Sequence, residues 1–183
     1  MNKILVICAH PDDEVLGCGG TLLKHKKNKD QINILFVFEG SSGRYNSKKD
    51  IKAIKDLKKR ENSAIKVASK LKAKSIKFLN YQNLITNSSI QLKITKDISE
   101  VIKRIDPDVI YTHSSKDLNI DHRTCLESVL VATRPDKKSS LKKLLCFEIP
   151  SSTEWAHNIF GNFSANYFVN IEKFLKEKLS LLK

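Results

Sequence analysis

The chain has 183 residues, of which 40% are hydrophobic, and its 33 basic and 20 acidic side chains give a formal net charge of +13. This length suits one domain with a sizeable core over residues 1–183, and no stretch has the composition of a linker. No apolar run approaches the ~18 residues of a membrane span, and the first residues lack the basic region of a signal peptide. We therefore expect a protein without a transmembrane segment, located in the cytoplasm or on the cytoplasmic side of a membrane.

The positive charge is expected to coat a solvated surface. Only five of the 33 basic residues are arginines, and the lysines fall mostly on the outer faces of expected helices, as in residues 48–59 and 66–77. No aromatic residues interleave with them, so we expect no nucleic-acid partner. Attraction to anionic substrates or lipid headgroups stays open. The four cysteines form no Cys-x-x-Cys pair, which indicates reduced thiols.

The apolar pattern, taken in chain order, alternates between strands and helices. The first apolar run, residues 4–8, predicts a strand buried on both faces, followed by a helix over 15–28. Further strands are expected at 32–38, 75–79, 109–112 and 144–147. Further helices are expected at 49–71, at 89–105, from the end of the 113–123 stretch to about 133, and from 171 onward. Such alternation predicts a mostly parallel, doubly wound α/β sheet.

The stretch 9–14 (Ala-His-Pro-Asp-Asp-Glu) places one histidine and three carboxylates at the carboxyl end of the first strand. In an open α/β sheet this edge is where ligands bind. Capping of the following helix is the alternative interpretation, but one acid would suffice for it. Three neighbouring carboxylates repel one another unless a cation lies among them, so the stretch favours a metal site.

A second histidine-bearing stretch, residues 113–123, follows the fourth expected strand and should reach the same edge. His10, Asp13 and His122 together offer two nitrogen ligands and one oxygen ligand. Three such ligands with a fourth position left for water are typical of a catalytic zinc site. Cys18 and Cys125 are poorly placed to act as ligands.

A dinucleotide-binding fold is the rival interpretation, because Gly17, Gly19 and Gly20 follow the first strand and Glu39 comes about 20 residues later. The third glycine of the Gly-x-Gly-x-x-Gly pattern is missing, since Leu22 occupies that place. The three carboxylates before the helix would also repel a pyrophosphate. The glycines more simply allow close helix packing beside the site.

Residues 9–14 and 119–123 (Asn-x-Asp-His-Arg) resemble the zinc-dependent N-acetylglucosaminyl deacetylases of the LmbE-like, or PIG-L, family. Residues 17–21, 113–119 and 151–155 match the family as well. The resemblance implies a Rossmann-like three-layer sandwich that hydrolyses the acetamide of an N-acetylglucosamine unit. It implies one Zn²⁺ per chain, bound by His10, Asp13 and His122.

The same resemblance implies catalytic roles beside the metal. Asp12 would be the general base that activates water. Asn119 takes the place of a histidine found in many relatives, and its amide can donate to an oxyanion but cannot shuttle a proton. Asp121 would either orient a ligand imidazole or cap the helix that follows.

Substrate contacts are expected from several elements. Arg60 matches a family arginine that binds the sugar or a phosphate, with a solvated helix charge as the alternative. Asn83 falls where relatives often have an aspartate that contacts sugar hydroxyls, and Arg44 lies in a loop at the same edge. His113 and Glu154 are further candidates, although an ordinary hydrogen-bonded histidine also fits position 113.

The sequence therefore predicts a zinc-dependent hydrolase that removes acetyl from a small glycoconjugate containing N-acetylglucosamine. Alternatives are a catalytically idle or differently specific sugar-binding relative, and an amidase acting on another amide. Relatives usually continue past the last helix with a segment that closes over the substrate, whereas this chain ends at Lys183. Either the substrate is reached differently or the chain is shortened, and a homo-oligomer is compatible with the sequence.

Overall fold

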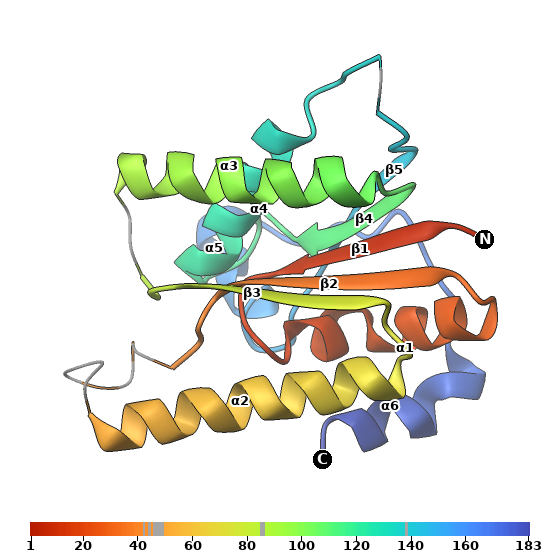
Figure 1. Cartoon of the computed structure of the whole chain (residues 1–183), viewed down its shortest axis with the longest axis horizontal. Helices are drawn as coiled ribbons and strands as arrows, with labels where there is room; N and C mark the ends of the chain where they lie inside the picture. Colours follow the sequence, from red (N-terminus) through yellow and green to blue (C-terminus); the bar gives the residue numbers. More distant parts are fainter. Residues whose placement is uncertain (42, 44, 46–49, 85–86, 138) are drawn as a thin grey trace.

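Five parallel strands form one sheet with the order β3-β2-β1-β4-β5 in the computed structural model (Figure 1). The structure describes residues 1–183 except 42, 44, 46–49, 85–86 and 138. The strands are β1 (Lys3–Cys8), β2 (Gln31–Phe38), β3 (Ser75–Tyr81), β4 (Val109–His113) and β5 (Lys143–Phe147). They match the predicted strands to within two residues at each end.

The central strand β1 explains why the first apolar run has no polar face. Ile4, Val6 and Cys8 contribute to the core on one face of the sheet. Leu5 and Ile7 contribute to the core on the other face. All of these side chains are fully buried, as expected for a parallel strand covered on both sides.

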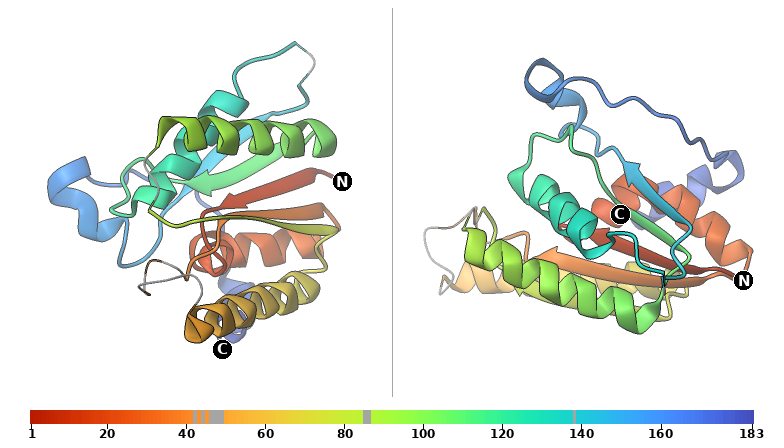
Figure 2. Two further views of the ribbon diagram at one scale, coloured as in Figure 1. Left: turned by 60° about the vertical axis from the view of Figure 1, so that its left-hand side comes forward. Right: turned by 90° about the horizontal axis from the view of Figure 1, so that it is seen from above.

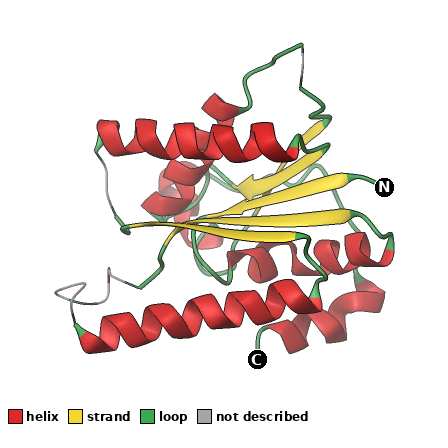
Figure 3. Cartoon of the chain, in the orientation of Figure 1, coloured by secondary structure: helices red, strands yellow, loops and turns green. Residues whose placement is uncertain are grey.

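Helices cover both faces of the sheet, so the molecule has three layers (Figures 1 and 3). One layer contains α3 (Ser88–Ile105) and α4 (Ile120–Ala132), and the other contains α1 (Asp13–Lys27), α2 (Ile51–Lys70) and α6 (Leu175–Leu181). The apolar residues of α3 recur with helical spacing, and its buried positions are Ile94, Ile98, Val101 and Ile102. The predicted Rossmann-like α/β sandwich with a parallel sheet is confirmed.

The chain beyond β5 is less regular. A 3-10 turn, η2 (Glu154–Ala156), leads into the short helix α5 (His157–Phe160). An extended segment then returns along the molecule to a second 3-10 turn, η3 (Glu172–Phe174), and to α6 (Figure 2). The helix predicted from residue 171 thus begins as a 3-10 turn and becomes α-helical only at Leu175.

Two glycines of α1 permit close packing, as the sequence suggested. A Cβ atom at position 17 would lie 2.3 Å from the Phe147 ring, and one at position 20 would lie 2.6 Å from Ile171. Any larger residue there would push α1 away from β5 or from the segment before α6.

The chain moves from β1 to β2 and β3 on one side, and then to β4 and β5 on the other. The carboxyl ends of β1 and β4 therefore meet at a topological switch point, where open α/β sheets form a crevice. Both histidine-bearing stretches begin there. Among the described residues, no helix has the length and apolarity that crossing a membrane requires.

Candidate metal centre

His10, Asp13 and His122 converge at this switch point. His10 follows β1, Asp13 is the first residue of α1, and His122 lies in the first turn of α4. Their ligand atoms form a triangle: Nδ1 of His10 is 3.3 Å from Nε2 of His122, and Oδ2 of Asp13 is 3.6 Å from the former and 3.5 Å from the latter. Ligands bound to one tetrahedral Zn²⁺ at ~2.1 Å are about 3.4 Å apart. The donor set and its spacing thus fit a zinc-like ion.

The charge state of Asp13 suits a ligand. Burial would raise its pKa, but the imidazoles of His113, His122 and His10 outweigh burial and hold the pKa well below its usual value. The carboxylate is therefore ionised and ready to bind a cation.

Each of the two candidate histidine ligands has a carboxylate beside its other ring nitrogen. Oδ2 of Asp121 lies 3.0 Å from Nε2 of His10, and Oδ2 of Asp117 lies 3.0 Å from Nδ1 of His122. Carboxylates in this position fix the tautomer and the orientation of a metal-binding imidazole. Burial lowers the pKa of His122, but Asp117 and Asp13 outweigh it and leave the pKa raised.

Asp117 had no role in the expectations from sequence, yet it is fully buried at the centre of a hydrogen-bond network. It accepts from the backbone N–H of Asn119 (2.8 Å), from Oγ1 of Thr153 (2.9 Å) and from Oγ of Ser152. Burial raises its pKa, but His122 and these donors lower it to about 2. Asp117 thus joins the loop before α4 to the loop after β5. The signal in the sequence was the position of Asp117 within residues 113–119, one of the stretches that match the family.

Asp121 does not cap α4, because Oδ1 accepts from the backbone N–H of Leu84 (2.8 Å) while Oδ2 faces His10. The cap is Asn119, whose Oδ1 accepts from the backbone N–H of Asp121 (2.9 Å). Only the amide nitrogen of Asn119 therefore remains for donation to a ligand.

The surroundings of His113 favour the ordinary hydrogen-bonded histidine that the sequence also allowed over a contact with substrate. Its side chain is fully buried, its Nε2 accepts from the backbone N–H of Ala9 (2.8 Å), and its ring stacks on His122 at 4.0 Å between centroids. His113, Asp117 and His122 also lie close enough to share an ion. However, Nε2 of His113 is occupied by the backbone donor, and Nδ1 of His122 faces Asp117, so the first triangle is the better centre.

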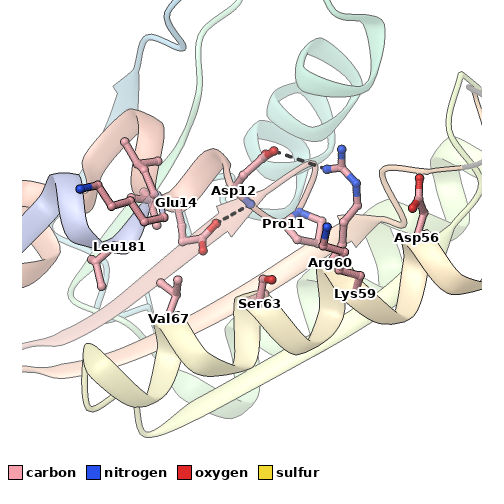
Figure 4. A pocket seen from close by; sticks show the side chains of 13 residues that line it. Pro11, Asp12, Glu14, Asp56, Lys59, Arg60, Ser63, Val67 and Leu181 are labelled. Atoms are coloured by element: carbon pink, nitrogen blue, oxygen red, sulfur yellow. Dashed lines mark hydrogen bonds and ion pairs between the residues drawn. The ribbon is translucent and has the colours of Figure 1, made fainter.

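Asp12 adopts a left-handed backbone conformation that is rare outside glycine, with φ 120° and ψ −29°. Its side chain makes no capping hydrogen bond to α1, so helix capping does not explain this residue. The Asp12 carboxylate instead lies 3.4 Å from Nη1 of Arg60 (Figure 4). The Asp12 side chain is half exposed to solvent. Burial and the neighbouring charge of Asp13 raise the pKa of Asp12 to about 6, although Arg60 opposes this rise.

Glu14, the third carboxylate of the motif, points away from the triangle. Its Oε2 accepts from the backbone N–H of Asp12 (3.0 Å), and burial raises the pKa of Glu14 to about 8. The side chain is 1% exposed. Glu14 therefore supports the unusual backbone of Asp12, a role that the sequence did not reveal.

The remaining predicted residues lie at different distances from the triangle. Asn83 contacts it: Oδ1 accepts from the backbone N–H of Gly40 (2.9 Å), and Nδ2 is 3.4 Å from Nε2 of His10. Glu154 is exposed, and its carboxylate accepts from the backbone N–H of Ser151 (2.7 Å). Arg44 lies outside the described residues.

Known proteins share this fold and sequence pattern. The uncharacterized deacetylase YaiS of Escherichia coli (strain K12) is 28% identical over 172 residues, which cover 90% of this chain and 84% of YaiS. The 4-carboxy-2-hydroxymuconate hydratase GalB from Pseudomonas putida KT2440 superposes with a TM-score of 0.77 at 22% identity, over 100% of this chain and 78% of GalB.

The N,N'-diacetylchitobiose deacetylase from Pyrococcus horikoshii superposes with a TM-score of 0.71 at 20% identity, over 99% of this chain and 68% of that enzyme. These two structural likenesses establish the fold. Residues 5–133, which include all three corners of the triangle, match the family described as GlcNAc-PI de-N-acetylase, PIG-L. The chain belongs to the PIG-L (LmbE-like) family.

Proposed function

We propose that this protein is a zinc-dependent N-deacetylase that hydrolyses the acetamide of a small glycoconjugate containing N-acetylglucosamine. The observation that carries the proposal is the triangle of His10, Asp13 and His122, with ligand atoms 3.3–3.6 Å apart. Asp12 directly precedes Asp13 in the chain. The family's description as a de-N-acetylase and the name of YaiS support the same reaction class. The likeness to the hydratase GalB concerns the fold and does not favour a second function.

His10, Asp13 and His122 would hold the ion. When bound, Zn²⁺ polarises the amide carbonyl and lowers the pKa of a water molecule. Asp12 would accept the proton of the attacking water on its carboxylate and pass it to the nitrogen of the departing amine. In the metal-free protein the pKa of Asp12 is about 6, and a bound cation lowers it, so the carboxylate is ionised at pH 7 and available as a base. The products are acetate and a glucosaminyl compound.

The surrounding residues position these groups. Asp121 and Asp117 would keep the two imidazoles in the tautomer that presents a lone pair to the ion. Arg60 holds the carboxylate of Asp12 and would also face the sugar. The amide of Asn119 would donate to the oxyanion that forms on the substrate carbonyl, and Asn83 would contact sugar hydroxyls.

The proposal is tested by measuring acetate release from a panel of N-acetylglucosaminyl compounds, with metal content determined by mass spectrometry on the same preparation. We expect one zinc per chain, acetate release by the loaded protein and none after chelation. Asp12→Asn should lower kcat by roughly 10²–10⁴-fold while zinc stays bound. Glu100→Gln, an exposed carboxylate on α3, is the matched control and should change neither quantity.

An idle sugar-binding protein, the alternative suggested by Asn119, would bind these compounds without releasing acetate. Acetate release that persists in Asp12→Asn would remove Asp12 from the proposed role. A zinc-loaded protein that releases acetate from none of the compounds would contradict the deacetylase assignment.

A further inference from the structure

A pocket of about 370 Å³ opens beside Asp12, between the start of α1, one face of α2 and the end of α6 (Figure 4). The size lies within the range of small-molecule sites. The mechanism above uses only Asp12 and Arg60 at one end of this pocket. The remainder has no role in the hydrolysis of an acetamide.

The wall that α2 contributes changes character along the helix. Lys59, Arg60 and Ser63 line the end nearer to Asp12, whereas Ala64 and Val67 line the other end. Arg60 and Val67 are about 10 Å apart along the helix axis. Leu181 of α6 faces the pocket near Val67 in Figure 4, so α2 and α6 both contribute apolar surface to the far end. Glu14 and Lys183 also line the pocket.

The polar end of the pocket lies next to the metal centre, although none of the three triangle residues lines the pocket itself. Asp12 lines the pocket and directly precedes Asp13 in the chain. Arg60 and His10 both lie close to Gly40. A Cβ atom built at Gly40 would be 3.4 Å from the Cβ of His10 and 3.6 Å from Nη1 of Arg60, so the Arg60 guanidinium lies near the His10 corner of the triangle. A molecule with its acetamide at the triangle could therefore extend past Asp12 and Arg60 into the pocket.

The lining favours an apolar group at the far end. Charges of both signs line the pocket, since the carboxylates of Asp12, Glu14 and Asp56 accompany Lys59, Arg60 and Lys183, so charge singles out neither an anion nor a cation. The far end offers apolar surface that only an apolar group can remove from water. We propose that this pocket holds the alkyl aglycone of the substrate, so that the preferred substrates are N-acetylglucosaminides with an apolar chain. This inference rests on the proposed deacetylase function.

The test compares octyl and methyl N-acetyl-β-glucosaminide, both below the micellar concentration of the octyl compound, on the zinc-loaded full chain. KM and kcat are measured by acetate release, and affinity by calorimetry. We expect a KM at least ten-fold lower for the octyl compound, because burial of a methylene contributes a factor of roughly four. Val67→Gln should raise the KM for the octyl compound at least five-fold and leave the methyl compound unchanged.

Two further variants keep the result interpretable. Leu182→Gln alters a pocket residue that is 46% exposed, so it tests the same wall without opening the core if Val67→Gln fails to fold. Leu92→Gln on α3, a leucine that is 56% exposed on the opposite face of the sheet, is the matched control and should change neither KM.

Equal KM values for the two glucosaminides, or an octyl preference that survives both pocket variants, would overturn the pocket assignment while leaving the deacetylase intact. If neither compound releases acetate, the deacetylase function fails, and calorimetry still decides the pocket. Tighter binding of the octyl compound that Leu182→Gln weakens would support the pocket in that case, and equal binding of both compounds would refute it.

Discussion

Two segments build the candidate centre, namely the loop after β1 with the first turn of α1 and the loop after β4 with the first turn of α4, and they hold Asp12, Glu14 and Asp117 in different ways. After β1, Asp12 has a strained backbone and Glu14 is buried, and the pKa values of both are raised, to about 6 and about 8. After β4, Asp117 is also buried, but hydroxyl, backbone and imidazole donors lower its pKa to about 2. Burial raises the pKa of all three groups, so the difference lies in their other neighbours: the charge of Asp13 raises the pKa values of Asp12 and Glu14, whereas His122 and the donors around Asp117 lower its pKa.

This difference suggests a division of labour. Carboxylates with raised pKa values can gain and lose a proton near neutral pH, whereas a carboxylate with a lowered pKa keeps a fixed charge. The loop after β1 would therefore supply proton transfer, and the loop after β4 would supply orientation of the imidazoles. The predictions that follow test each side of this comparison.

The largest effect is expected at Asp13, the one carboxylate of the first loop whose pKa is lowered. Asp13→Asn removes the charge that three imidazoles surround, so the protein should lose both bound zinc and acetate release. Mass spectrometry of metal content and the acetate assay measure the two losses. A variant that kept stoichiometric zinc would show that His10 and His122 bind it without Asp13.

Asp117→Asn tests whether the loop after β4 orients the imidazole of His122. Loss of the negative charge beside Nδ1 of His122 should weaken zinc binding by roughly 10–100-fold. Chelator competition measures this change, with Asp121→Asn as the matched variant on His10. Asp117→Asn should also lower the free energy of unfolding by roughly 1–3 kcal/mol, because donors such as Thr153 lose an ionised acceptor. Unchanged zinc affinity in both variants would argue against an orienting role.

The pH dependence of kcat/KM tests the proton-transfer side. Protonated Asp12 cannot accept a proton, so activity should fall about ten-fold per pH unit on the acid limb. The pKa of about 6 applies without a bound cation, and a cation lowers it, so this limb lies at or below pH 6. Arg60 lowers the pKa of Asp12, and Arg60→Gln should therefore move the limb to higher pH. If the acid limb of kcat/KM lies at the same pH in Arg60→Gln as in the wild type, a group other than Asp12 determines the pH of that limb.

The sequence predicts most of the fold because burial and periodicity are local signals. The strand over 75–79 continues to Tyr81, and the first helix begins at Asp13, two residues earlier than predicted. The end of the chain was harder to predict, because the 3-10 turn before Leu175 depends on packing against α1. Contacts between distant segments are absent from a local pattern.

The predicted triangle comes together because both stretches end parallel strands at one sheet edge, a rule that needs no coordinates. The partners of each carboxylate did not follow from that rule. Spacing alone could not tell that Asp121 faces His10 while Asp117 faces His122, or that Glu14 turns inward to the backbone of Asp12. Such pairings depend on side-chain directions at contacts between loops.

The smallest expected effect concerns Glu14 in the metal-free protein. Its pKa is about 8 in the native state against an ordinary value of 4.5, so between these pH values the native state holds a proton that the unfolded state releases. Stability therefore falls as pH rises through this window.

Glu14→Gln keeps an oxygen that can accept from the backbone N–H of Asp12 but cannot titrate. From pH 6.5 to 8, where Asp12 is already mostly ionised, the wild type should lose on the order of 1–2 kcal/mol more unfolding free energy than the variant. Urea denaturation at several pH values gives the unfolding free energy of each protein as a function of pH. The other titrating groups contribute equally to the wild type and the variant, so the difference between the two pH slopes reports Glu14 alone. Parallel slopes would mean that Glu14 is ionised in the native protein, and the first loop would then carry a fixed charge like the second.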